Sequence, residues 1–135
     1  MNFELEEDEK RDIVKRSFKF ALRIIHIIGR LPKNQAALAI GGQLVRSGTS
    51  VGANVEEAKA GFSKQDFTYK MSIASKEIRE SNYWLRLLYY SDLIPQNSKL
   101  YSDIESAIGE SEEMKKILTS IVKTAKEKSN KNDGN

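Results

Sequence analysis

The sequence predicts an all-α protein, an antiparallel up-and-down four-helix bundle with a disordered C-terminal tail. The 135 residues include only two prolines and eight glycines and are rich in Leu, Ile, Lys, Glu and Ala, a composition that favours helices. Long amphipathic stretches alternate with short connections, as in a bundle. A chain of this length can bury one core. We therefore expect a single domain over residues 1–126 and a tail over residues 127–135.

The first two helices are expected over residues 8–30 and 34–59. Acidic residues lie in the first turn of the first helix, where the helix dipole favours them, and the dipeptide Leu31-Pro32 ends it. In the second, Gly61 suits a left-handed C-terminal cap.

The third helix is expected over residues 64–91, because Ser63 in "SKQD" can cap it and Asp66 follows three positions later. The fourth is expected over residues 98–126. Its seam follows alternating spacings of four and three and consists of Leu100, Ile104, Ala107, Ser111, Met114, Leu118, Ile121 and Ala125. The segment "KEKSNKNDGN" lacks apolar residues, which predicts the tail.

A stripe of mostly small residues follows one side of the second helix. It comprises Ala37, Ile40, Leu44, Ser47, Gly48, Val51, Val55 and Ala58. Small side chains let a neighbouring helix approach closely. We expect bulky side chains of the third helix to fill the remaining space, namely Phe67, Met71, Ile78 and Leu85.

The stretch "GTSVG" resembles the elbow that presents the nucleophile of serine hydrolases. That elbow needs a strand before the serine and a histidine late in the chain, whereas the only histidine, His26, precedes Ser50 and no strand is predicted. No lysine follows the glycines as in a phosphate-binding loop. We therefore predict no catalytic residue, no enzymatic activity and no cofactor.

Other site classes are excluded by composition. There is no cysteine, so neither a disulfide nor a thiolate zinc site is expected, and one histidine cannot anchor a metal alone. The N-terminus lacks the pattern of a signal peptide, and no stretch has the length of apolar residues that a membrane span needs. These observations predict a cytoplasmic protein.

Charge is distributed unevenly along the chain. Residues 1–12 carry six acids and two bases, and residues 13–55 carry seven bases and no acid. One arc of the first helix and its following connection gathers Lys15, Arg16, Lys19, Arg23, Arg30 and Lys33, with His26. Such a stripe suits the phosphates of a nucleic acid. The alternative is a solvated or salt-paired stripe, which includes one that meets an acidic protein.

The apolar arc of the first helix is wider than one core requires, which indicates an oligomer. In the third helix, Trp84 lies away from the main seam with Ile73 and Leu87. These residues form either a second contact surface or a cover for the flank of an adjacent helix.

A polar line on the second helix contains Gln43, Arg46, Ser50, Asn54 and Glu57. It is either an ordinary solvated face or a hydrogen-bonded network at a subunit contact.

The segments "RSGTSVGANVEEAKAG" and "SKQDFTYKMSIASKEIRESNYWLRLL" resemble the bacterial four-helix bundle proteins known as 23S rRNA intervening-sequence proteins. Accessory proteins of diversity-generating retroelements belong to the same superfamily. The pattern falls on Arg46, Ser50, Gly52, Asn54, Glu57 and Ala58, and then on Phe67, Lys70, Glu77, Glu80, Trp84 and Leu85.

The resemblance implies a homopentamer without known catalytic activity. It makes Arg46, Ser50, Gly52, Asn54, Glu57 and Trp84 candidates for a structural or subunit-contact motif. The partners expected are further copies of the chain, RNA or DNA, and a reverse transcriptase or another protein. Two functions remain open: nucleic-acid or ribonucleoprotein binding through the basic face, and a protein-binding scaffold.

Overall fold

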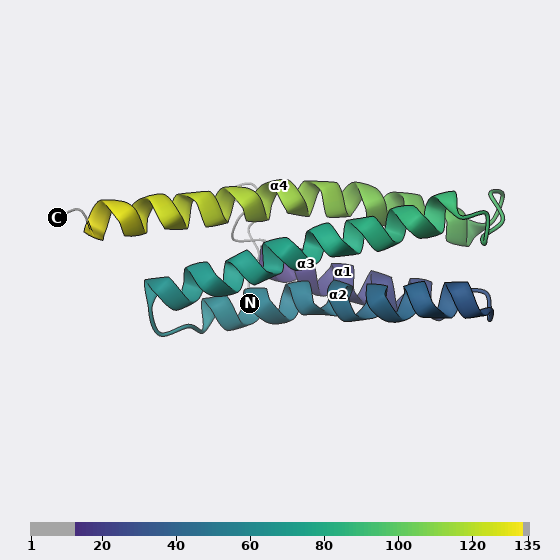
Figure 1. Cartoon of the computed structure of the whole chain (residues 1–135), viewed down its shortest axis with the longest axis horizontal. Coiled ribbons are helices and arrows are strands. Elements are labelled where there is room, and N and C mark those ends of the chain that lie inside the picture. The colour runs from purple at the N-terminus through teal and green to yellow at the C-terminus, as the bar shows by residue number, and fades with distance from the viewer. Residues whose placement is uncertain (1–12, 134–135) are drawn as a thin grey trace.

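The structure, a computed structural model, describes residues 13–133 as four helices. They are α1 (Ile13–Ile28), α2 (Gln35–Lys59), α3 (Lys64–Tyr90) and α4 (Lys99–Asp133). Figure 1 shows them running up and down along one long axis. Contacts join α1 to α2, α2 to α3, α3 to α4 and α4 back to α1, whereas the diagonal pairs do not touch within these residues. The predicted four-helix bundle is confirmed.

The predicted end of α1 is two residues late, and its predicted start at residue 8 lies outside the described residues. The helix ends at Ile28 because the hydrogen-bond spacing shortens there from four residues to three: the amide of Arg30 donates to the carbonyl of Ile27. Leu31 then turns inward and is buried, which fixes the direction in which the chain leaves α1.

The cap predicted at Ser63 for the third helix is confirmed, and α2 begins directly after Asn34, which caps it. The Asn34 side chain accepts from the amide of Ala37, and the Ser63 hydroxyl accepts from the amide of Asp66. Each bond satisfies an amide that would otherwise lack a partner in the first turn.

The predicted left-handed cap at Gly61 is wrong. The C-cap of α2 is Ala60 in a right-handed conformation, and no glycine among the described residues has a positive φ. A Cβ at Gly61 would lie 3.1 Å from the Ala58 carbonyl oxygen and 2.5 Å from Oδ2 of Asp66, a side-chain end that can turn away. Space at this turn is therefore tight, and a left-handed backbone is not what glycine provides there.

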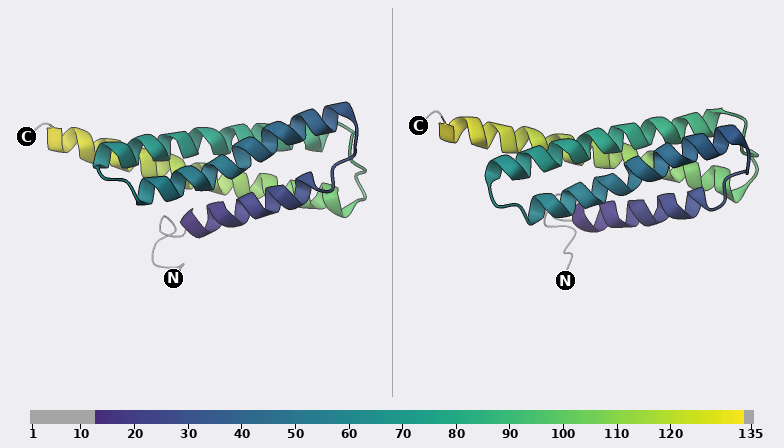
Figure 2. Two further views of the ribbon diagram at one scale, coloured as in Figure 1. Left: turned by 90° about the horizontal axis from the view of Figure 1, so that it is seen from below. Right: turned by 60° about the horizontal axis from the view of Figure 1, so that its bottom comes forward.

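Helix α4 continues past the predicted boundary at residue 126 and ends at Asp133. The residues that follow Ala125 carry no fully buried side chain up to residue 130. Lys and Glu are good helix formers, so the loss of apolar residues marks where α4 leaves the bundle and not where it ends. Figure 2 shows α4 projecting beyond the other helices, and α1 beginning inside the same end of the bundle.

The core contains the predicted seams of α3 and α4. Met71, Ala74, Ile78 and Leu85 are buried, as are Ile104, Ala107, Met114 and Leu118. Two polar pairs lie within this apolar interior: the Ser81 hydroxyl donates to Ser47 at 2.9 Å, and the Asn82 amide donates to Ser111 at 2.9 Å. These two pairs form a polar layer that the apolar pattern alone did not predict.

Gly41, Gly48 and Gly52 of α2 face α1 rather than α3, which corrects the packing expected from the sequence. A Cβ at Gly48 would lie 3.0 Å from the Ile24 side chain, and one at Gly52 would lie 3.3 Å from the Ser17 carbonyl oxygen. The absence of side chains therefore lets α1 approach the backbone of α2 closely.

Candidate functional site

The basic residues predicted on α1 follow the groove between α1 and α4. Arg16 donates from Nε and Nη2 to the two carboxylate oxygens of Glu110, at 3.1 and 2.9 Å. Two parallel bonds of this kind hold a guanidinium in a fixed orientation. The Arg16 charge is therefore matched by α4.

A second ion pair lies toward the other end of this groove. Arg30 contacts Asp103 at 2.8 Å, and Lys99 reaches the same carboxylate at 3.1 Å. Hydrogen bonds from Arg30 first, and then from Lys99, hold the pKa of Asp103 below its usual value. Two cations thus share one carboxylate, and the cluster keeps a positive charge.

A hollow of about 330 Å³ opens along the groove at the Arg30–Asp103 pair. Its polar lining consists of Lys19, Arg23 and His26 of α1, Arg30 of the turn after α1, and Asp103 and Ser106 of α4. Arg23 donates to the neutral Ser106 hydroxyl at 3.2 Å. We refer to Lys19, Arg23, His26 and Arg30 as the basic patch.

Two further predicted residues lie at the margins of this groove. Lys15 is half-buried near the start of α1, and Lys33 is exposed in the connection between α1 and α2. The structure thus brings Lys19, Arg23 and Arg30 together at the hollow and pairs Arg16 separately. The acids of α4 that meet these bases were not predicted, although Asp103 and Glu110 lie seven residues apart and so share one helix face.

The polar line of α2 belongs to a network that reaches α3. Arg46 donates from Nη1 to Glu77 at 3.1 Å and also pairs with Glu80. The Gln43 side chain accepts from Nε of Arg46 at 3.4 Å. Glu77 is buried although it is acidic, and Arg46 supplies the charge that such burial requires.

Trp84 and Glu57 extend this network along α3. The Trp84 indole donates to Glu80 at 3.1 Å, and Lys70 contacts Glu57 at 3.6 Å. Trp84 is half-buried and meets Tyr83 edge-on, with 5.0 Å between ring centroids. Trp84 also packs against the hydrophobic core of the chain.

Ser50 and Asn54 make bonds within α2. The Ser50 hydroxyl donates to the carbonyl of Arg46 at 2.7 Å, and the Asn54 amide donates to the carbonyl of Ser50 at 2.8 Å. Ser50 therefore lies mid-helix with its hydroxyl engaged, whereas a nucleophile elbow places serine between a strand and a helix.

The described part of the chain offers no group of three or more His, Asp or Glu side chains that could hold a metal ion. Within the same residues, no helix is long and apolar enough to cross a membrane.

Apolar side chains are exposed on two separate faces. Phe18, Leu22 and Ile25 follow one side of α1, and Tyr83, Leu87 and Tyr90 follow the outer side of α3. We refer to these sets as the α1 face and the α3 face. The wide apolar arc predicted for α1 is thus confirmed as an exposed surface, which exceeds what the core of one chain uses.

Residues 9–120 match the model of a protein family described as "23S rRNA-intervening sequence protein". The chain belongs to this family.

A solved structure supports the assignment. It is a protein of unknown function of the S23 ribosomal protein family from Bacteroides thetaiotaomicron VPI-5482, with 36% sequence identity to this chain. The match covers 86% of this chain and 99% of that one, with a TM-score of 0.74. No curated protein matches the chain.

Several residues that carry the family resemblance meet at the seam between α2 and α3. Arg46, Glu77, Glu80 and Trp84 are joined in one network there, and Glu57 pairs with Lys70 further along the same two helices. Ser50 and Asn54, which bond within α2, and Gly52, which faces α1, are exceptions. In the single chain the ion pairs of Arg46 and Glu57 link α2 to α3.

Proposed function

We propose that this family member is a non-enzymatic, homo-oligomeric protein that binds nucleic acid, alone or within a ribonucleoprotein, through the basic patch. One observation carries the proposal: four basic side chains converge on one hollow that contains a single carboxylate, that of Asp103. Asp103 is already bound by Arg30 and Lys99. A phosphate entering the hollow would therefore meet a net positive charge.

The chemistry of the patch suits a phosphate group. Arg23 donates one N–H group to the Ser106 hydroxyl, and its other guanidinium N–H groups remain for an anion. Lys19 has no partner among residues 13–133. Contacts of this kind release counterions from the nucleic acid and do not read base sequence, so we expect salt-sensitive binding with little sequence selectivity.

The test is fluorescence anisotropy with labelled single-stranded RNA and duplex DNA across a salt series. The test variant combines Lys19→Glu, Arg23→Glu and Lys33→Glu, none of which takes part in an ion pair with a described residue. The matched control combines Lys76→Glu, Lys116→Glu and Lys123→Glu, three exposed lysines away from the groove. Circular dichroism checks that all three proteins fold.

The expected result is binding by the parent and the control and its loss in the test variant. Affinity should fall as salt rises, and the slope of log affinity against log salt should be negative, with a magnitude of about 0.7–0.9 per phosphate contact. If the parent does not bind at low salt, or if the control loses as much affinity as the test variant, the proposed patch is wrong.

We also propose that the chain self-associates through its exposed apolar faces. The α1 face and the α3 face belong to diagonal helices of the bundle, so a contact between them would be head-to-tail and could close into a ring. The family resemblance makes five the expected number of copies. Multi-angle light scattering measures it, and a monomer at micromolar concentration would contradict self-association.

The second candidate function is a protein-binding scaffold in the cytoplasm. The observation in its favour is the aromatic character of the α3 face, because Tyr and Trp are enriched where proteins bind each other. A reverse transcriptase is one such partner, by analogy with the retroelement proteins of the superfamily. This candidate predicts no nucleic-acid affinity at physiological salt.

A further inference from the structure

The hollow of the basic patch contains more hydrogen-bond donors than its own residues use. Arg30 is already engaged: its Nε donates to the carbonyl of His26 at 3.2 Å, and its Nη2 contacts Asp103 at 2.8 Å. The remaining side-chain donors at the hollow belong to Lys19, Arg23, His26 and Ser106. Apart from the bond between Arg23 and Ser106, these four side chains have no partner among residues 13–133.

Ser106 adds a donor that carries no charge. Its oxygen accepts from Nη1 of Arg23 at 3.2 Å, so its O–H group is left to donate. The His26 ring has an N–H group in either charge state, and Lys19 and Arg23 keep charged N–H groups. The hollow of about 330 Å³ is large enough for an anion of several atoms, since about 10–15 Å³ holds one water molecule. Charged and neutral donors from both helices thus surround one site.

The charges at the hollow match a dianion better than a single negative charge. Lys19, Arg23 and Arg30 contribute three positive charges and Asp103 one negative charge, which leaves a net charge of +2 with His26 neutral. A phosphate monoester carries about −1.5 to −2 charges at pH 7 and has three strong acceptor oxygens. An internal phosphodiester of a strand carries one negative charge and has one terminal oxygen fewer. Because Coulomb attraction is proportional to charge, the lining favours the monoester.

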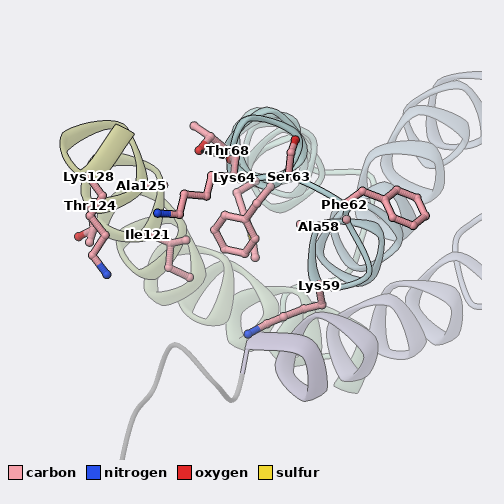
Figure 3. A pocket seen from close by; sticks show the side chains of 13 residues that line it. Ala58, Lys59, Phe62, Ser63, Lys64, Thr68, Ile121, Thr124, Ala125 and Lys128 are labelled. Carbon is pink, nitrogen blue, oxygen red and sulfur yellow. Dashed lines mark hydrogen bonds between the residues drawn. The ribbon is translucent and has the colours of Figure 1, made fainter. Parts of the chain in front are cut away.

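The larger hollow of the bundle is built differently. It has a volume of about 550 Å³ and lies where α2 turns into α3, over an apolar floor that includes Met71 and Ile121. Its lysines stand on three different helices: Lys59 on α2, Lys64 on α3 and Lys128 on α4. Figure 3 shows these lysines spread around the hollow. The smaller hollow, where donors of one α1 stripe meet a hydroxyl of α4, is therefore the better phosphate site.

We propose that the hollow of the basic patch binds a phosphate monoester, which in a nucleic acid is the terminal phosphate of a strand. Lys19 and Arg23 compensate its charge, and Ser106 and His26 donate to its remaining oxygens. The inference rests on the proposed function and deepens it, because it names the chemical group that the patch selects. Internal phosphates are then held only by the attraction that any basic surface exerts.

The test compares two single-stranded RNAs of one sequence, both labelled at the 3′ end, of which one carries a 5′-phosphate and the other a 5′-hydroxyl. Fluorescence anisotropy at physiological salt measures their affinities for the full chain. We expect the phosphorylated RNA to bind about tenfold more tightly, because it adds a doubly charged group that forms strong charge-assisted hydrogen bonds. Equal affinities would overturn the inference and leave the proposed function intact.

Ser106→Ala separates recognition in the hollow from general attraction, because it removes a donor without changing the charge. It should reduce the preference for the phosphorylated RNA about threefold or more. The control is Ser102→Ala, an exposed position one turn earlier on α4 that does not line the hollow, and it should keep the full preference. A preference that Ser106→Ala leaves unchanged would show that the hollow does not bind the strand end, and the inference would fail.

Two charge variants locate the site on the molecule, and circular dichroism checks that both fold. Arg23→Gln should abolish the preference, because it removes a charged donor from the hollow. Lys59→Gln, Lys64→Gln and Lys128→Gln together should weaken the binding of both RNAs equally and keep the preference. Loss of the preference in this second variant alone would move the site to the larger hollow and contradict the inference.

Uridine 5′-monophosphate and uridine distinguish a strand end from a free small molecule. At millimolar concentration, the monophosphate should shift the amide NMR signals of His26 and Ser106 and displace the phosphorylated RNA, whereas uridine should do neither. If neither RNA binds, the proposed function fails. Shifts caused by the monophosphate would then still support the phosphate site, with a small molecule as its source, and their absence would overturn the inference.

Discussion

Arg46 of α2 holds the buried carboxylate of Glu77 in α3, with 3.1 Å between Nη1 and Oε2. The same guanidinium pairs with Glu80, so one cation serves two acids one turn apart. A lysine has a single charged nitrogen without the planar fork of a guanidinium. Contact with two carboxylates at once therefore favours arginine over lysine at this position.

We predict that Arg46→Ala destabilises the fold by about 1–3 kcal/mol. Removing the partner of a buried carboxylate leaves an uncompensated charge, and the cost is lowered here because the Arg46 side chain is itself 49% exposed. Urea unfolding followed by circular dichroism measures the change. Gln43→Ala is the control, because it removes only a 3.4 Å bond to the same arginine. Equal effects of the two variants would show that the Glu77 pair adds nothing.

Gly52→Ala and Gly42→Ala should have opposite effects. A Cβ at Gly52 meets the Ser17 backbone at 3.3 Å, and that backbone cannot give way as a side chain would, whereas a Cβ at Gly42 has nothing within 4 Å. We expect a loss of about 1–3 kcal/mol for the first and a gain of about 0.5–1 kcal/mol for the second. Thermal unfolding distinguishes them. Stabilisation by both would mean that α1 does not pack this closely on α2.

Arg30→Gln should raise the pKa of the Asp103 carboxyl toward its usual value, because the hydrogen bond from Arg30 is the largest cause of its lowering. The folded pKa is depressed, so the stabilisation from this pair is complete above the unfolded pKa of about 3.9 and is lost as the pH falls through the lower folded pKa. Carbon-13 NMR titration of the carboxyl follows the change. Lys99→Gln should give a smaller rise, and a larger one would reverse the assigned order of causes.

Asp103→Asn should strengthen nucleic-acid binding about threefold to tenfold at low salt, because Asp103 is the only carboxylate among the described residues that line the hollow of the basic patch. The same anisotropy assay measures it. Binding that weakens or stays the same would mean that phosphates do not enter the hollow.

Self-association should be lost when Phe18→Glu and Ile25→Glu are combined. These side chains are 57% and 48% exposed on the α1 face, so charging them leaves the core of one chain intact while opposing burial in a contact. Light scattering should give the mass of a monomer. Tyr69→Glu, another exposed position outside both faces, is the control. An oligomer that survives the double variant uses another surface.

The sequence was sufficient for the helices and their seams, because periodic apolar residues such as Ile104 and Leu118 define a buried stripe without knowledge of the partner helix. The cap at Ser63 was equally local. The end of α4 was predicted too early. The predicted boundary followed the last apolar residues, whereas helix-forming residues continue beyond them.

The candidate site was only partly predictable. The arc of bases on α1 follows from helical geometry, but the acids that meet Arg16 and Arg30 come from α4, and no rule of spacing within one helix connects them. The partner of Glu77 was obscured for the same reason. Gly61 misled the prediction because its backbone is not left-handed, so a glycine after the last helical residue did not mark that type of cap.

The polar layer of Ser47, Ser81, Asn82 and Ser111 limits how the helices can slide along each other. Apolar seams tolerate a shift of one helical turn, since Leu, Ile and Met replace one another with modest cost. A shift of α3 by one turn would separate Ser81 from Ser47 and Asn82 from Ser111. The serine hydroxyls would keep their bonds to carbonyls of their own helices, whereas the Asn82 amide would lose its partner on α4, and a buried group left unsatisfied costs about 1–3 kcal/mol. Two small hydrogen-bonded pairs thereby select one alignment of the bundle from several that the apolar residues alone would accept.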